Sequence, residues 1–202
     1  MSKWLKFFLL CIIVIIIVVF FQKFTKINYK SEEKGNNKNI QEIEEYFLKQ
    51  NSYNAKLEVT VKSNKNVNYY KIEQSVNLPK EVKQVITSPE DVAGIELIYK
   101  EGKLEIRNSK YNLSKIYKDY PYISSNNLFL TSFLEGYKNA KEKEIKEVEG
   151  KVEMEYKSNI NKFNAKQKLY INKSTLKPET LDIFDINNNA KINIIYNEIE
   201  FK

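Results

Sequence analysis

The sequence of 202 residues contains no histidine and only one cysteine, Cys11. Without histidine, the chain can form neither a Ser/His/Asp nor a Cys/His catalytic relay, and it cannot hold a metal ion through imidazole. A single cysteine excludes an internal disulfide and a thiolate zinc site. Because these groups are missing, we expect a protein that is not an enzyme and that carries no cofactor and no metal.

The acidic residues do not mark a site either. Asp185, Asn187 and Asn189 match the first three ligand positions of a calcium-binding loop. Ala190 stands where that loop needs glycine, however, and Tyr196 stands where it needs a bidentate acid. We therefore interpret this segment as a hairpin turn.

One long apolar run lies near the N-terminus. Residues 7–21 include no polar side chain, and residues 4–21 together make 18 residues, roughly 27 Å of helix, which is enough to cross a bilayer. A cleaved signal peptide would have a similar apolar core, but residues 22–26 offer no cleavage site between small residues. We expect a transmembrane anchor with basic flanks at residues 1–26, a flexible tether at residues 27–39 and a single domain at residues 40–202.

Positive charge is concentrated beside the apolar run. The formal net charge is +7, and residues 1–39 hold seven Lys and two Glu. The remaining residues are nearly neutral, and they contain one arginine, Arg107, with lysines interleaved among glutamates. A domain that binds nucleic acid needs a clustered basic surface, so we expect a membrane contact through the anchor and no nucleic-acid partner. Lysines flank the run on both sides, so charge does not set its orientation.

The hydrophobic periodicity of the domain predicts two helices and many strands. Residues 40–50 have apolar side chains at helical spacing, which favours packing on the core, although a helix that binds a partner would show the same pattern. A second helix is expected at residues 128–141, with Asn126 and Asn127 as N-cap residues. Alternation of period two indicates strands at residues 53–62, 67–78, 81–87, 94–99, 104–107, 143–149, 151–157, 163–172, 180–185 and 191–201. Short turns between so many strands predict an α+β fold, mainly an antiparallel sheet.

Aromatic residues are the remaining candidates for a binding site. The sequence has 14 tyrosines, and aromatic side chains on the second helix and on two strands could form an apolar groove or its cover. Tyrosine also favours half-buried sheet positions, so the pattern favours a purely structural role over a binding groove. The residues assigned to this groove or cover are Phe129, Phe133, Tyr137, Tyr99 and Tyr70.

Two stretches carry a family resemblance. Residues 85–108 (VITSPEDVAGIELIYKEGKLEIRN) and residues 169–201 (LYINKSTLKPETLDIFDINNNAKINIIYNEIEF) resemble the LolA-like superfamily of exported lipoprotein carriers and its Gram-positive relatives. The resemblance implies a curved, incomplete antiparallel β-barrel whose concave side is covered by helices. Within the superfamily, the chain is most similar to GerS-type spore germination proteins. These proteins support a cell-wall amidase that modifies spore cortex peptidoglycan.

The resemblance leads to two functional hypotheses. In the first, the chain is a membrane-anchored accessory protein that binds a peptidoglycan amidase during sporulation or germination. In the second, it is a carrier or sensor of lipid or lipoprotein acyl chains, which would need an open apolar cavity. Both place a single-pass protein in the cell membrane with its C-terminal domain outside the cytoplasm. The usual lipidated cysteine of GerS-type proteins is missing here, and the apolar anchor stands in its place.

Overall fold

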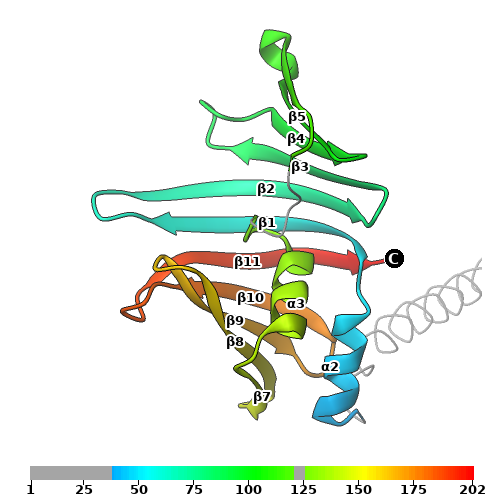
Figure 1. Ribbon diagram of the computed structural model, residues 1–202, viewed down its shortest axis with the longest axis vertical. Coiled ribbons are helices and arrows are strands. Elements are labelled where there is room, and N and C mark those ends of the chain that lie inside the picture. The colour runs from blue at the N-terminus through cyan, green and yellow to red at the C-terminus, as the bar shows by residue number, and fades with distance from the viewer. Residues whose placement is uncertain (1–37, 121–125) are drawn as a thin grey trace, which may run out of the picture.

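The computed structural model of the protein describes residues 38–120 and 126–202. These residues form one sheet of eleven strands, all paired antiparallel, with two α-helices and a short 3-10 helix (Figure 1). The strand order is β6-β5-β4-β3-β2-β1-β11-β10-β9-β8-β7. Only β1 and β11 are neighbours in the sheet without being neighbours in the chain, so the fold consists of two meanders joined at that pair. The expected α+β class with a mainly antiparallel sheet is confirmed.

The elements agree closely with the periodicity of the sequence. Ten of the eleven strands coincide with predicted ones, and the helix expected at residues 40–50 ends at Leu48. The strand β6 and the 3-10 helix η1 were not predicted. The helices are α2 (Ile40–Leu48), η1 (Ser109–Tyr111) and α3 (Leu130–Asn139). The strands are β1 (Ser52–Lys62), β2 (Val67–Asn77), β3 (Glu81–Ser88), β4 (Ile95–Lys100), β5 (Lys103–Asn108), β6 (Leu113–Tyr117), β7 (Lys143–Val148), β8 (Lys151–Asn161), β9 (Asn164–Asn172), β10 (Lys177–Phe184) and β11 (Ala190–Phe201).

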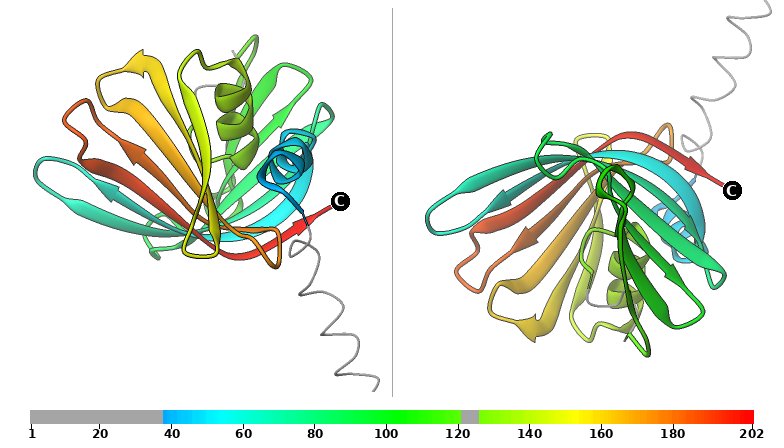
Figure 2. Two further views of the ribbon diagram at one scale, coloured as in Figure 1. Left: turned by 90° about the horizontal axis from the view of Figure 1, so that it is seen from below. Right: turned by 90° about the horizontal axis from the view of Figure 1, so that it is seen from above.

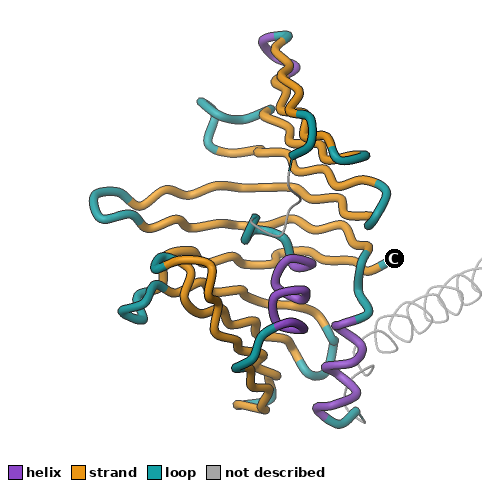
Figure 3. Tube along the Cα trace, in the orientation of Figure 1, coloured by secondary structure: helices purple, strands orange, loops and turns teal. Residues whose placement is uncertain are grey.

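The sheet is strongly curved and does not close. Its end strands are β6 and β7, and no pairing joins them within the described residues. Both α-helices lie on the concave side of the sheet (Figures 2 and 3). The unclosed, curved sheet with helices on its concave side is as the family resemblance implied.

Alternation along the strands separates a dry face from a wet face. In β1, Ala55, Leu57 and Val59 are buried, whereas Asn54 and Lys56, at alternate positions, are exposed. Because successive strand residues point to opposite faces, every second residue of the central strands contributes to one core under the helices. Burial of such apolar side chains contributes about 1.5–3 kcal/mol each.

Helix α2 is a part of this core. Its first turn is stabilised by a capping box, in which Asn39 and Glu42 exchange backbone and side-chain hydrogen bonds of 2.9 and 3.0 Å. Ile43 and Phe47 are fully buried, and the ring of Phe47 packs edge-on against Phe201 at a centroid distance of 5.8 Å. The helix thus closes the end of the sheet where β1 begins and β11 ends.

The start of α3 is fixed by buried polar groups of the sheet. Its N-cap is Phe129, which makes no side-chain cap, so the prediction of Asn126 and Asn127 as caps is wrong. The Leu130 amide instead donates to the hydroxyl of Tyr53 at 3.1 Å, which replaces a local cap by a contact from β1. Asn126 accepts a hydrogen bond from the Leu128 amide at 3.1 Å, so it organises the turn before the helix.

The predicted anchor at residues 1–26 and nearly all of the predicted tether at residues 27–39 lie outside the described residues. Across residues 38–120 and 126–202, none of the helices combines the length and apolar character needed to span a membrane. The division into anchor, tether and domain remains a prediction.

Candidate functional site

Two of the predicted groove residues lie inside the core. Phe133 and Tyr137 are almost fully buried between α3 and β8, where Phe133 packs against Tyr156 at 5.4 Å between ring centroids. Burial, followed by the nearby carboxylate of Glu44, raises the pKa of Tyr137. These rings fill the core between α3 and β8. The hollow beside them, of about 350 Å³, is lined mainly by polar residues and by neither Phe133 nor Tyr137.

The two residues Tyr99 and Phe129 are brought together in one small pocket. This pocket has a volume of about 220 Å³ and is completed by apolar residues of β3, β4 and β5. Pockets that hold small molecules usually measure about 300–1,000 Å³. The fifth predicted residue, Tyr70, lies on β2 and packs against the core without lining this pocket. The space beside Tyr99 and Phe129 is therefore small for an acyl chain.

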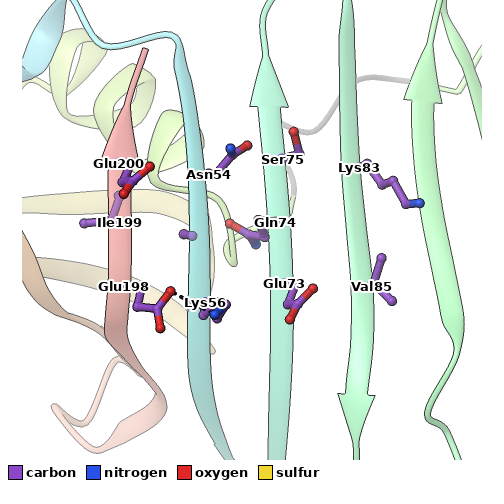
Figure 4. Close-up of a pocket in the computed structure, with 11 residues that line it drawn as sticks. Asn54, Lys56, Glu73, Gln74, Ser75, Lys83, Val85, Glu198, Ile199 and Glu200 are labelled. Atoms are coloured by element: carbon purple, nitrogen blue, oxygen red, sulfur yellow. Dashed lines mark ion pairs between the residues drawn. The ribbon is translucent and has the colours of Figure 1, made fainter.

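A shallow hollow on the opposite face of the sheet has a different character. Its volume is about 380 Å³, and it is lined mainly by polar residues of β11, β1, β2 and β3 (Figure 4). Lys56 pairs with Glu198 across it at 2.9 Å, and Lys83 pairs with Glu96 at 3.3 Å. Because these charges are matched in pairs, the hollow has the character of an ordinary solvated sheet surface.

The free edge of the sheet at β6 exposes apolar side chains. All five residues of β6 are exposed, with 64% of Leu113 and 58% of Ile116 accessible to solvent. Tyr111 of η1 and Tyr117 add two exposed rings beside them. Within the described residues no strand pairs with the outer side of β6, so its backbone donors and acceptors on that side are available to another chain.

The free edge of the sheet at β6 also carries positive charge. Residues 109–118 contain Lys110, Lys115 and Lys118 and no acidic residue. Behind the edge, Arg107 is neutralised by Glu96, with a distance of 2.6 Å between Nε and Oε2. Burial alone would raise the pKa of Glu96, but hydrogen bonds from Arg107 and Lys83 lower it on balance. Residues 109–118 are therefore locally basic, with Glu105 of β5 beside Ser114 at 2.9 Å and Asp119 directly after Lys118 as the nearby acidic groups.

The other edge strand, β7, is built differently. Four of its six residues are charged, and Lys146 pairs with the buried Glu153 of β8 at 3.3 Å. Glu147 pairs with Lys173 at 2.7 Å, and α2 packs against this strand. Charged side chains and a covering element are the usual means by which proteins protect an edge from pairing. By this comparison β6 is the edge that can accept a partner. We define residues 110–118, all of which are exposed, as the β6 edge.

The segment that resembles a calcium loop is a turn. Asp185 Oδ1 accepts hydrogen bonds from the backbone amides of Asn187 and Asn189 at 2.9 and 2.8 Å, and Asn188 has a φ of 63°. Burial alone would raise the pKa of Asp185, but these contacts and Lys191 lower it to about 2. The predicted hairpin turn is confirmed. In the part of the chain that the structure describes, no group of three acidic or cysteine residues is placed to hold a metal ion.

The sequence matches a family model described as sporulation protein YdcC-like over residues 5–202. The chain belongs to the YdcC-like sporulation protein family. No curated protein matches the sequence.

Solved structures similar to this YdcC-like protein include the GerS lipoprotein, from the complex of the CwlD amidase with GerS of Clostridioides difficile. The TM-score is 0.54 and the identity 23%, with 80% of this chain and 93% of that chain covered. A second is an uncharacterized conserved protein from Thermus thermophilus, with a TM-score of 0.49, 13% identity, and 80% and 86% of the two chains covered. A third is a LolA superfamily protein from Nitrosomonas europaea, with a TM-score of 0.41, 9% identity, and 81% and 93% covered. The expected likeness to GerS is confirmed at the level of the fold.

Proposed function

We propose that this YdcC-like protein is a non-enzymatic accessory protein that binds a cell-wall amidase through the β6 edge, in sporulation or germination. The partner would add an extended segment to β6 by strand pairing, with acidic side chains opposite Lys110, Lys115 and Lys118. An N-terminal helix would hold the protein in the cell membrane with its domain outside the cytoplasm.

The observation that carries this proposal is the contrast between the two edges of one open sheet. The β6 edge exposes apolar and basic side chains, whereas β7 carries paired charges. GerS, which shares the fold, is found in complex with the CwlD amidase, and membership of a sporulation family supports the same process. The aromatic filling under α3 favours a scaffold over a carrier of acyl chains.

The β6 edge can be tested by a pair of matched variants. Leu113→Ser with Ile116→Ser removes the exposed apolar contacts of β6, whereas Val148→Ser makes the same change on β7. All three residues are exposed in the free protein, so we expect stability changes within about 0.5 kcal/mol. The measurement is the Kd of the full chain for the amidase of the same organism. We expect at least a tenfold loss for the β6 variant and no change for Val148→Ser, and added salt should weaken wild-type binding.

Wild-type affinity in the β6 variant would refute this surface as the docking site. Equal losses in the β6 and β7 variants would point to a nonspecific effect and would also count against it. The biological part of the proposal predicts that deletion of the gene impairs cortex modification. Normal cortex peptidoglycan in the deletion strain would contradict that part alone.

A further inference from the structure

A wide, open pocket lies at the end of the sheet where three hairpins meet. It has a volume of about 680 Å³, within the usual range for ligand sites. Its lining comes from the turns β1–β2 and β8–β9 and from the neighbouring ends of β10 and β11. Its apolar floor is formed by Val61, Ile183 and Ile192, which are adjacent in the registers of β1, β11 and β10. We call this cavity the hairpin pocket.

The rim of the hairpin pocket is basic. Lys62, Lys65 and Lys191 line it, and the lining contains no aspartate or glutamate. Lys191 is paired with Asp185 at 3.2 Å, but within the described chain no ion pair engages Lys62 or Lys65. Two uncompensated ammonium groups beside an otherwise neutral cavity favour a ligand with negative charge.

Amide groups make up the rest of the polar lining, and several of them are already held in place. Asn164 is buried; it donates to Asn127 at 2.9 Å and accepts from Gln167 at 3.0 Å. Asn161 accepts hydrogen bonds from the backbone amides of Phe163 and Asn164 at 2.8 and 3.1 Å. A wall that is fixed before binding reduces the entropic cost of ordering, and amides both donate to and accept from hydroxyl groups.

An aromatic ring stands at the same rim. Phe163 is 59% exposed although it lies in a short turn that Asn161 holds, and Lys162 Nζ is 5.0 Å from its ring centroid. Exposed aromatic rings offer a flat apolar surface to a ligand that also has polar edges. Sugar rings have both an apolar face and a periphery of hydroxyl groups, so ring, amides and lysines together match a glycan that bears carboxylates.

The position of the hairpin pocket separates it from the N-terminal end of the domain. The chain enters β1 from α2 at Ser52, and the pocket lies at the other end of β1, beside Lys62. An eleven-residue strand spans roughly 33 Å. Figure 1 shows α2 and the C-terminus at one end of the sheet and the β1–β2 hairpin at the other. A site at this far end faces away from the segment that would approach a membrane, which favours a polymer over a lipid headgroup.

We propose that the hairpin pocket binds a carboxylate-bearing glycan chain. A nucleic acid would also supply negative charge and flat rings, but single-stranded nucleic acid is usually bound along an extended basic groove. Here the unpaired cations are limited to one pocket, and the single arginine of the chain lies elsewhere, in β5. This inference goes beyond the proposed partner, and the hairpin pocket and the β6 edge share no residue.

The test uses calorimetry to measure the binding of defined oligosaccharides to the full chain in detergent micelles. The probe is a soluble tetrasaccharide of alternating N-acetylglucosamine and N-acetylmuramic acid, and its uncharged counterpart is the tetramer of N-acetylglucosamine. We expect saturable binding of the acidic probe and at least fivefold weaker binding of the neutral one. We expect the affinity for the acidic probe to fall at least tenfold in Phe163→Ala, and likewise in the double variant Lys62→Gln with Lys65→Gln.

The controls are Ile186→Ala and Lys177→Gln, which change an exposed apolar residue and an exposed lysine outside the pocket. Both variants should bind the acidic probe as tightly as the wild-type protein does. Leu113→Ser with Ile116→Ser should also keep glycan binding, whereas Phe163→Ala should keep amidase binding. Failure of this inference is thus distinguishable from failure of the proposed function. No saturable binding of the acidic probe, equal binding of the neutral probe, or wild-type affinity in the pocket variants would overturn the proposal. It would also be overturned if polyphosphate or vesicles of anionic phospholipid bound more tightly through the same lysines.

Discussion

Gly136 lies at the point where α3 packs on β8, and the hydroxyl of Tyr156 occupies the place that a Cβ would take. We expect Gly136→Ala to destabilise the protein by about 1–3 kcal/mol through overpacking, although alanine favours an exposed helix by about 1 kcal/mol. Urea unfolding measures the difference. In a Tyr156→Phe background, where the hydroxyl is absent, the cost should be smaller. A Gly136→Ala variant as stable as wild type would show that α3 does not approach β8 so closely.

Glu153 should make the stability of the protein depend on pH. It is 6% exposed, with Lys168 Nζ at 3.0 Å and Lys146 Nζ at 3.3 Å. Burial alone would raise its pKa, but the hydrogen bonds and charges of Lys168 and Lys146 lower it below the ordinary 4.5. A carboxyl with a lowered folded pKa binds protons more weakly than in the unfolded chain. Its contribution is therefore complete above the unfolded value and is lost as the pH falls from about 4.5 through the lower folded value.

We expect Glu153→Gln to cost about 1–3 kcal/mol at pH 7 and to flatten the acid limb of the stability curve. Urea midpoints between pH 7 and pH 3 measure both effects. Glu200→Gln, on an exposed position of β11, serves as the control and should leave the curve unchanged. A Glu153→Gln variant that loses stability in acid as steeply as wild type would contradict this role.

At the scale of elements, Gln74 connects α3 to three strands. Its Nε2 donates to Gln84 at 2.9 Å and to the carbonyl of Leu128 at 3.1 Å, and its Oε1 accepts from the hydroxyl of Tyr53 at 3.2 Å. Gln74→Leu removes these three hydrogen bonds, so we expect the free energy of unfolding to fall by about 2–3 kcal/mol. Amide exchange in α3 should accelerate, first at Leu130. Ser75→Ala, on the exposed face of β2, should change neither quantity.

The start of α3 depends on a contact that local sequence patterns do not reveal. The periodicity of residues 128–141 predicts an amphipathic helix, but the group that satisfies its first amide, the hydroxyl of Tyr53, is 77 residues away in the chain. Local capping rules consider only neighbouring residues and cannot find such a contact. They therefore predict Asn126 and Asn127 as N-cap residues, which they are not. The strand β6 was missed because both of its faces are exposed and it has no clean alternation. A short apolar and basic run directly after β5 was the available signal.

At the scale of the whole molecule, the sequence predicts the sheet but not which side chains occupy its concave side. Alternation along the strands and short turns predict an antiparallel sheet, because these features are local. Its curvature was implied only by the resemblance to LolA-like proteins. Whether the concave side is open depends on how α3 lies across β8, which is a tertiary property. Of the five aromatic candidates, Phe133 and Tyr137 fill the core, Tyr99 and Phe129 line a small pocket, and Tyr70 stands apart from it. The β6 edge and the hairpin pocket were not among the predicted site residues.

The filled interior leads to a prediction about acyl chains. The full chain should show no saturable binding of a fluorescent fatty acid, because Phe133 and its neighbouring rings occupy the space under α3. Phe133→Ala should open a cavity there, at a cost of about 3–5 kcal/mol, and should gain measurable binding. Tight binding of the probe by the wild-type protein would instead favour the carrier function.

Pairing of the β6 edge with an amidase can be detected by hydrogen exchange. Backbone amides on a free strand edge exchange rapidly, and pairing with another strand slows them. The measurement compares exchange in the full chain with and without the amidase of the same organism, at saturating concentration. We predict at least tenfold slower exchange in residues 113–117 and no change in residues 143–148 of β7. Unchanged exchange in β6 while the amidase is bound would contradict the account.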